Sequence, residues 1–373
     1  MLIPTAVSKT RNFGLDVMRA TAILLVLVAH AFHIIAPQIP KSISFISLPD
    51  GVDVFFVLSG FLVGGIWIDM LERNESGLLK TFFWKRWLRT LPSYFIVITL
   101  LFLLRLYFSA GTFAFPWRYF LFVQNMYVPE WDPYYFYPEA WSLSVEEWFY
   151  VLMPLSTLFL LRFIQQPKKT VFLFATVMLV VPFLLRILFF VQHPIESLDD
   201  WNRYLRHIMV YRLDMIGFGV LAAWLKYYRN KHWEMMRCYK TLGMLLLLAS
   251  TIIYHFYAFG FMFLSLFYFS IVGVGLLLLL PTIESMKCTS PRIISTVTFL
   301  SVISYAVYLL NRSVILYPLI LPFKPVFASS VVLTLGAYVG YVILVMLIAY
   351  GFYRFVEQPI LAFRDKLDIK KRQ

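Results

Sequence analysis

The chain has 373 residues, of which 61% are hydrophobic and only 14% are charged, and these proportions exclude an ordinary soluble domain. Apolar runs of roughly 18 or more residues recur along nearly the whole sequence, so they predict an all-α polytopic membrane protein. The net charge of +13 reflects basic segments between the spans and attraction to an anionic membrane leaflet, and we expect no nucleic-acid partner.

About ten transmembrane helices are expected. The first apolar run is too long for a signal-peptide core and lacks a small-residue cleavage pattern, so we expect it to remain as the first span. The aromatic stretch FAFPWRYFLFVQNMY, which starts at Phe113, is too short and too interrupted to span and is expected to be interfacial or re-entrant. The expected spans lie near residues 14–36, 51–70, 88–108, 141–162, 170–191, 204–227, 241–259, 261–281, 296–321 and 329–355.

The distribution of charge predicts that both termini are cytoplasmic. With that orientation the cytoplasmic segments hold roughly 22 Lys and Arg residues and the outer loops about 6, as the positive-inside rule requires. The basic segments include WKRWLR, RFIQQPKK, KYYRNKHWEMMRCYK and FRDKLDIKKRQ, whereas the outer loops VPEWDPYYFYPE and HPIESLDDWN are acidic and aromatic. We expect one integral membrane domain over residues 1–373 and no soluble second domain.

The first span carries two ionisable residues on one face. Arg19 and His30 are eleven residues apart, which is three helical turns plus about 20° and about 16 Å along the axis. Arg19 then lies near the cytoplasmic end and His30 in the outer half. Either the two residues line a path through the protein, or Arg19 extends to the headgroups and His30 binds a neighbouring backbone group.

Further polar residues gather at the outer level. A histidine near carboxylates can act as a general base, with one carboxylate fixing its tautomer and another group binding the acceptor. The alternative is an inter-helix network that only satisfies buried charges, in which Arg212 pairs with Asp214 or a glutamate. The outer set is His30, Asp53, Glu146, Glu147, Arg212, Asp214 and Asn311.

A second set lies at the cytoplasmic level. In FFWKRWLRTLPSYF, Arg86 and Arg89 are three residues apart on one helix, so both can face a single site. Clustered arginines bind phosphate in bidentate fashion, although positive-inside topology alone also places basic residues here. The cytoplasmic set is Arg19, Lys85, Arg86, Arg89, Arg354 and Glu357, and we assign Lys85 to topology. Cys238 and Cys288 form neither a disulfide framework nor a metal pattern, and no metal site is expected.

Six segments, in order along nearly the whole chain, resemble the signatures of the acyltransferase-3 family of integral membrane acyltransferases. They are LDVMRATAILLVLVAH, GVDVFFVLSGFLVG, KRWLRTLPSYF, AWSLSVEEWFYVLMPL, SYAVYLL and YRFVEQPI. Two positions depart from the family pattern: Asn311 replaces the usual histidine of the ninth helix, and Trp148 replaces a glutamine.

The resemblance implies transfer of an acyl group, usually acetyl, from cytoplasmic acetyl-CoA to a hydroxyl of an extracytoplasmic glycan or glycolipid such as a lipopolysaccharide O-antigen. The family's arginine and histidine carry onto Arg19 and His30, and its arginine pair onto Arg86 and Arg89. We expect His30 to be the base, oriented by Asp53 or the Glu146 and Glu147 pair, although an acyl-histidine intermediate is also open.

Arg212, Asp214 and Asn311 are the expected acceptor-binding residues. The resemblance also places the protein in a bacterial inner membrane. The alternative function is a transporter of a lipid-linked glycan or small solute, for which we would expect inverted repeats, and we find none.

Overall fold

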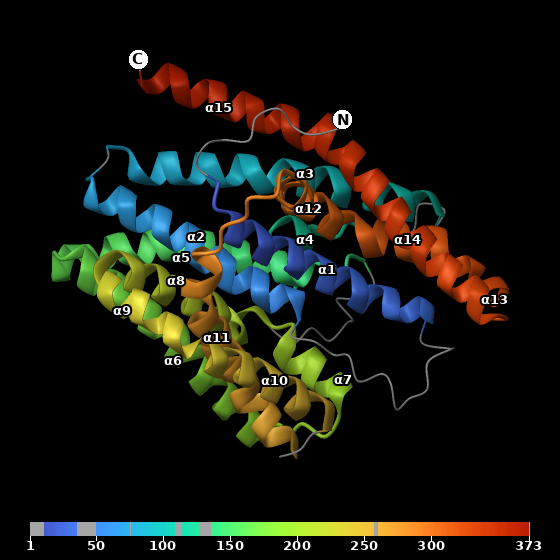
Figure 1. Ribbon diagram of the computed structural model, residues 1–373, viewed down its shortest axis with the longest axis horizontal. Helices are drawn as coiled ribbons and strands as arrows, with labels where there is room; N and C mark the ends of the chain where they lie inside the picture. Colours follow the sequence, from blue (N-terminus) through green and yellow to red (C-terminus); the bar gives the residue numbers. More distant parts are fainter. Residues whose placement is uncertain are drawn as a thin grey trace.

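The computed structural model describes residues 11–35, 50–74, 76–108, 114–126, 136–256 and 260–372. Within these ranges all regular structure is helical, which confirms the expected all-α class (Figure 1). Nine helical segments there are long and apolar enough to cross a membrane. The chain is therefore an integral membrane protein.

The long helices follow the apolar runs of the sequence. They are α1 (Phe13–Ile35), α2 (Gly51–Glu72), α3 (Leu78–Phe108), α5 (Ala140–Ile164), α6 (Pro167–Gln192), α10 (Lys240–Phe256), α11 (Gly260–Glu284), α12 (Pro291–Leu310) and α14 (Val331–Phe352). Helix α14 continues through a π segment, η8 (Tyr353–Glu357), into α15 (Gln358–Arg372), so α14 and α15 form one long rod in Figure 1.

One expected span differs in the structure. The region near 204–227 divides into α7 (Leu198–Trp201), a π segment η3 (Asn202–Arg206), a 3-10 turn η4 (Met209–Tyr211) and α8 (Leu213–Tyr228). Helix α8 has 16 residues, which at 1.5 Å each is about 24 Å and falls short of a hydrocarbon core of about 30 Å. Length and apolar composition alone therefore identify nine spans in the described ranges, where the sequence predicts about ten, and the tenth expected segment is this broken one, in which η3, η4 and α8 follow one another.

One further difference concerns α3, whereas the stretch that follows it agrees with the prediction. Helix α3 begins ten residues earlier than the expected 88, because its basic first turns are helical and continue the span. The aromatic stretch from Phe113 forms, in its described part, only the single turn α4 (Trp117–Phe120) and so does not span, as expected. The remaining short helices are α9 (Asn230–Met235), α13 (Lys324–Phe327) and the 3-10 turns η5 (Met236–Tyr239) and η7 (Leu321–Phe323).

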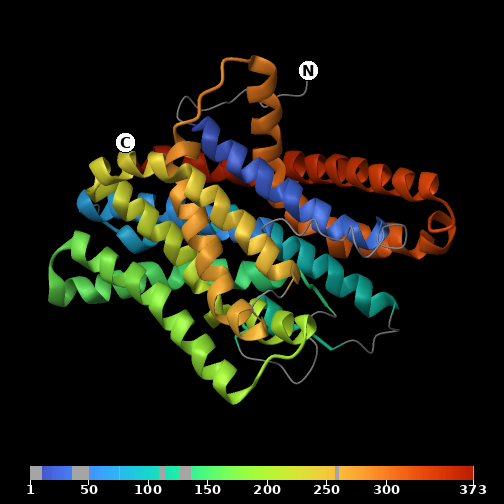
Figure 2. The ribbon, with the colours of Figure 1, turned by 60° about the horizontal axis from the view of Figure 1, so that its bottom comes forward.

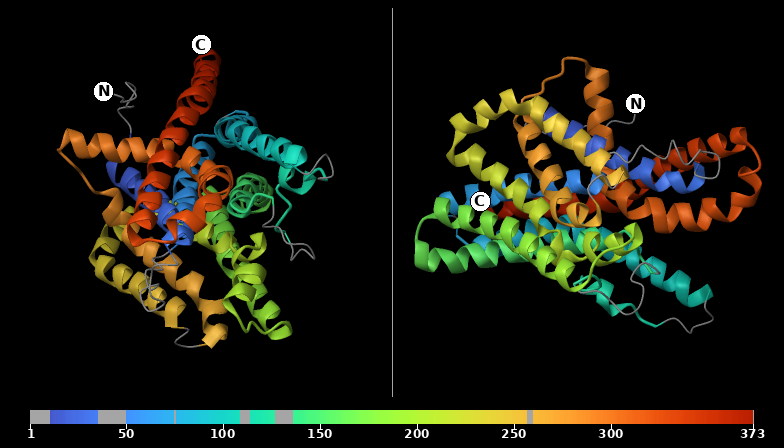
Figure 3. Two further views of the ribbon diagram at one scale, coloured as in Figure 1. Left: turned by 90° about the vertical axis from the view of Figure 1, so that its right-hand side faces the viewer. Right: turned by 90° about the horizontal axis from the view of Figure 1, so that it is seen from below.

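Helix α2 lies at the centre of the bundle. Of the apolar 18-residue stretch by which α2 can span the membrane, 67% is buried inside the protein. The corresponding share is 17% for the α14–α15 segment at the periphery. The left view of Figure 3 looks along the bundle, with α1 and α2 near the middle. Figure 2 shows α6 at one edge, where it packs on α5 and α8. A helix buried on most sides can be lined by apolar residues all round, which is the composition of α2.

Two glycines set the distance between α2 and α8. A Cβ atom on Gly60 would lie 2.1 Å from the carbonyl oxygen of Ile216, and one on Gly219 would lie 2.1 Å from that of Val57. The two backbones therefore touch, and only residues without a side chain fit at the crossing, as at close helix crossings in membranes generally. This contact brings the first turns of α2 and α8 next to each other.

Candidate functional site

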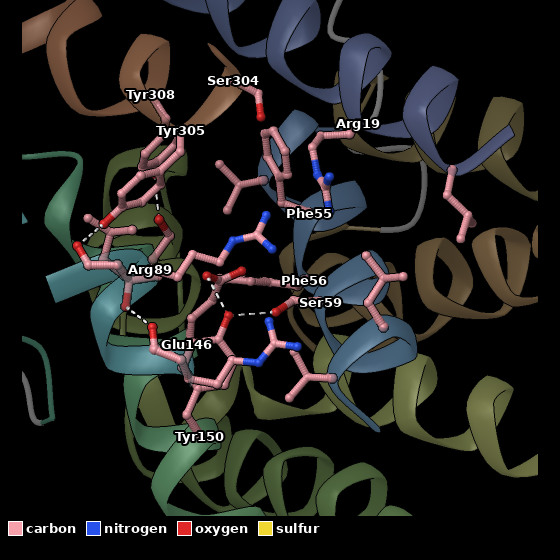
Figure 4. A pocket seen from close by; sticks show the side chains of 18 of the residues that line it. Arg19, Phe55, Phe56, Ser59, Arg89, Glu146, Tyr150, Ser304, Tyr305 and Tyr308 are labelled. Carbon is pink, nitrogen blue, oxygen red and sulfur yellow. Dashed lines mark hydrogen bonds between the residues drawn. The ribbon is translucent and has the colours of Figure 1, made fainter. Parts of the chain in front are cut away.

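A cavity of about 530 Å³ lies between α1, α2, α3, α5 and α12 (Figure 4). Helix α2 supplies one continuous face of its lining, from Val52 through Ser59 to Ile66. Ile66 is 14 residues after Val52, which corresponds to about 21 Å along the helix. Among the residues of α1, the lining extends only as far as Arg19. The passage therefore follows α2, whereas the sequence predicts a path along the polar face of α1.

Three guanidinium groups enter this cavity from two helices. Arg19 comes from α1, and Arg86 and Arg89 come from α3, where their spacing of three residues puts them on one side. Figure 4 shows the side chains of Arg19 and Arg89 pointing into the cavity. Within the described part of the chain, none of the three forms an ion pair with a carboxylate.

The cavity carries an excess of positive charge. Its lining holds four arginines and two carboxylates. One of these carboxylates, Asp16, is already bound: Arg11 donates to it at 2.5 and 2.9 Å, and the Ser301 hydroxyl donates at 2.6 Å. Arg19 reaches the same Ser301 hydroxyl at 3.5 Å. The predicted phosphate-binding residues are therefore brought together, with their charges largely uncompensated.

The paired glutamates point to different places, because adjacent residues on a helix diverge by about 100°. Glu146 lines the cavity beside the arginines and accepts a hydrogen bond from Tyr150 at 3.2 Å, while Tyr150 and Ser59 are 3.0 Å apart (Figure 4). Glu147 is buried outside the lining and accepts from Thr90 at 2.7 Å. The sequence assigns Glu146 to the outer level and the arginines to the cytoplasmic level, but in the structure they share one site.

His30 lies outside the cavity lining but is joined to one end of it. Its Nδ1 is 2.5 Å from Oδ1 of Asn311. Asn311 in turn donates to the carbonyl of Tyr308, a residue of the cavity lining. The Tyr308 hydroxyl is 2.5 Å from Ser142 Oγ, which also lines the cavity. The structure therefore brings His30 and Asn311 together at the Tyr308 end of the passage.

Asp53, Arg212 and Asp214 lie away from the cavity, in a buried layer between α2, α6 and α8. Arg212 pairs with Asp53, and Asp214 pairs with Arg186 at 2.7 Å. The expected pairing of Arg212 with Asp214 or a glutamate is not the one formed. The carboxylate of Asp53 is thus bound to Arg212, whereas Nδ1 of His30 faces Asn311. These three residues therefore belong to an inter-helix network of buried charges, which was the alternative to a functional site at these positions.

Glu139 and Ser313 lie next to the Tyr308 end of the cavity, outside its lining. The carboxylate of Glu139 accepts from the Ser313 backbone N–H at 2.7 Å and from its hydroxyl at 2.6 Å. Burial raises the pKa of the Glu139 carboxyl above its ordinary value, although the Arg312 charge and the Ser313 bonds oppose this shift. The Tyr308 hydroxyl also donates to the Glu139 carbonyl at 3.1 Å.

Sequence reasoning missed several residues of the site. Ser59, Tyr150 and Thr90 carry the hydrogen bonds of the two glutamates, and Tyr308 and Ser142 close one end of the cavity. Single hydroxyl residues are common in apolar spans, so they do not identify a site. Only its position four residues after Glu146 on the same helix marks Tyr150 as a neighbour of that glutamate. The aromatic residues of the outer segment WDPYYFYPEAW make it a candidate for sugar stacking, but of this segment only residues 136–141 are described, and there Phe136, Tyr137 and Trp141 are buried in the protein.

A family model described as an acyltransferase domain matches residues 12–354. The peptidoglycan O-acetyltransferase OatA of Listeria monocytogenes is 30% identical over 130 residues, which are 32% of this chain and 21% of that protein. The O-acetyltransferase OatA of Staphylococcus aureus is 31% identical over 162 residues, 40% of this chain and 25% of that protein. The matched region is thus a quarter or less of each relative's length. No solved structure matches the chain.

Proposed function

Because this chain belongs to the acyltransferase-3 family, we propose that it is an O-acetyltransferase, which moves an acetyl group from cytoplasmic acetyl-CoA to a hydroxyl of a glycan across the membrane. Two relatives named as O-acetyltransferases support this activity, and one of them is named for peptidoglycan. Peptidoglycan therefore joins the lipopolysaccharide O-antigen as an acceptor to test. The proposed location is a bacterial inner membrane with both termini cytoplasmic.

The observation that carries the proposal is the set of three guanidinium groups in one elongated cavity. Arg19, Arg86 and Arg89 form no ion pairs with carboxylates in the described ranges, so they can bind the phosphates of CoA. Guanidinium binds phosphate in bidentate fashion through charge-assisted hydrogen bonds. The α2 face beyond them is mainly apolar, which suits the thin pantetheine arm and keeps water from the thioester.

In this proposal the thioester lies near the Tyr308 end of the cavity, beside His30. The imidazole accepts the proton of the acceptor hydroxyl, and the oxygen attacks the thioester carbonyl carbon. The carbon–sulfur bond then breaks, and the proton passes from the imidazole to the leaving thiolate. If an acyl-histidine forms instead, labelled acetyl-CoA will leave an acetyl group on His30 when no glycan is present.

Donor binding is tested with titrations of CoA against Arg89→Ala and Lys80→Ala variants in nanodiscs. Both substitutions remove one positive charge from α3, but Lys80 lies outside the cavity, beside Trp84 and Trp87. Loss of a charge-assisted hydrogen bond predicts about 10-fold weaker CoA binding, or more, for Arg89→Ala only. Equal affinities of the two variants for CoA would contradict the assignment of Arg89 to the donor site.

Transfer is tested by release of free CoA from acetyl-CoA, with and without peptidoglycan fragments or lipopolysaccharide. We expect release that depends on one of these glycans in the wild type and its loss in His30→Ala, while CoA binding is retained. Mass analysis of the glycan then locates the acetyl group. A wild-type protein that binds no acyl-CoA and releases no CoA would instead favour the transporter.

A further inference from the structure

The side-chain amide of Asn311 can adopt only one orientation. Its Nδ2 donates to the carbonyl oxygens of Val307 and Tyr308, both at 2.9 Å. Both partners are pure acceptors, so the end of the amide that faces them must be the NH₂ group. The other end, Oδ1, therefore faces His30, and Tyr341 reaches the same oxygen at 3.4 Å.

This orientation determines which imidazole nitrogen carries the proton. Oδ1 of an amide accepts hydrogen bonds and cannot donate them, and it lies 2.5 Å from Nδ1 of His30. A hydrogen bond at this distance requires a proton on Nδ1. In a neutral imidazole the lone pair is then on Nε2.

We infer that Asn311 is a positioning residue that holds His30 in the Nδ1-protonated tautomer, so that Nε2 is the atom that takes the acceptor hydroxyl's proton. The part of this inference that concerns the hydroxyl rests on the proposed function. The tautomer itself does not. A neutral amide here takes the orienting role expected of Asp53, whose carboxylate is bound to Arg212.

The helix around Asn311 explains why the amide is held firmly. Asn311 is fully buried and begins the π segment η6 (Asn311–Ile320), directly after α12. At this junction its side chain binds two backbone carbonyls of α12, and the carboxylate of Glu139 binds the backbone N–H of Ser313. Side chains thus form hydrogen bonds with backbone groups at the α-to-π transition. Rotation of the Asn311 amide would break its two hydrogen bonds to the carbonyls of α12.

The tautomer is tested by ¹⁵N NMR of histidine-labelled protein in bilayers, because protonated and unprotonated ring nitrogens have well-separated shifts. A His30→Ala difference spectrum identifies the signal of this residue among the six histidines. We expect an Nδ1-protonated ring in the wild type and in Asn311→Asp, which keeps an acceptor oxygen. Asn311→Leu keeps the branched shape but not the acceptor, and we expect a mixture of tautomers. Tyr341→Phe is the matched control and should retain the wild-type signal.

Kinetics provide the second measurement. For Asn311→Leu we expect kcat to fall about 10- to 100-fold, the usual range for loss of an orienting partner, with unchanged KM for acetyl-CoA and unchanged CoA binding. Asn311→Asp should recover part of that loss. An Nε2-protonated ring in the wild type, or Asn311→Leu with wild-type tautomer and kcat, would overturn the inference. If no glycan is acetylated, the NMR result still stands, and only the proposed function fails.

Discussion

The guanidinium of Arg212 lies against the ring of Phe269, with Cζ 3.8 Å from the ring centre, and it donates to the carboxylate of Asp53 at the same time. Both charged residues are buried, with exposed fractions of 0% and 1%. Two further nitrogens of Arg212, Nε and Nη1, have no hydrogen-bond partner in the described structure. The pair is thus a buried charge network that is only partly satisfied.

Removal of one member of this pair should destabilise the protein. Asp53→Asn leaves the Arg212 charge uncompensated, a loss of about 3–5 kcal/mol for buried pairs in general. Replacement of both members by apolar residues, as in Asp53→Leu with Arg212→Met, should recover most of the loss. The measurement is the thermal unfolding midpoint in detergent. A double variant that is stable but inactive would show that Asp53 serves the reaction, whereas a stable and active one assigns it to packing.

The sequence predicts the long helices and the arginine cluster well, because both depend on local patterns. The spans arise from apolar runs, and Arg86 and Arg89 share a side of α3 through their spacing alone. The pairing of buried charges depends on contacts between helices. Arg212 directly precedes α8 and Asp214 lies in its first turn, and each finds its partner on a different neighbouring helix.

The shape of the cavity is likewise a tertiary property. Its largest wall is α2, where only Ser59 among the lining residues from Val52 to Ile66 is polar. An apolar wall of this kind cannot be told from a lipid-facing or core-facing surface by composition. Arg19 and His30 share a predicted face of α1, but packing against α12 and η6 places Arg19 in the cavity and His30 against Asn311.

Glu146 should weaken donor binding in the wild type, because its carboxylate lies in the cavity with Arg86 and Arg89. Glu146→Gln keeps the size of the side chain and an acceptor for Tyr150 while it removes the negative charge. We expect CoA to bind a few-fold more tightly, on the order of 1 kcal/mol for one nearby charge at a hydrated site. Calorimetric titration measures this effect. Weaker CoA binding in Glu146→Gln would mean that the carboxylate organises the arginines rather than opposing the phosphates.

Gly60→Ala should destabilise the bundle, whereas Gly65→Ala on the same helix should not. The new Cβ at position 60 meets the Ile216 carbonyl at 2.1 Å, and at position 65 nothing lies within 4 Å. Separation of two packed helices costs about 1–3 kcal/mol, while alanine itself favours the helix by up to about 1 kcal/mol. The unfolding midpoints of the two variants should therefore shift in opposite directions. Equal shifts would show that α2 and α8 do not touch at Gly60.

Asp50 and Arg206 should make the stability of the protein depend on pH at the start of α2. The Asp50 side chain accepts from the Val52 backbone N–H at 3.1 Å and pairs with Arg206. Burial opposes ionisation of Asp50, but the Arg206 charge and the Val52 bond outweigh it and lower the pKa of this carboxyl below its ordinary 3.8. Since the folded-state pKa is the lower one, the stabilisation is present above the ordinary value and is lost as the pH falls through the folded-state value.

Asp50→Asn isolates this charge, because asparagine is also a good helix cap. At neutral pH we expect the wild type to unfold at the higher temperature, with a difference on the order of 1 kcal/mol for a partly exposed pair. The two midpoints should converge as the pH is lowered below about 4, where the unfolded carboxyl is protonated. Other acidic groups titrate in both proteins and cancel in the difference. Equal midpoints at neutral pH would mean that the Asp50 charge adds nothing and that Asp50 acts through its cap hydrogen bond alone.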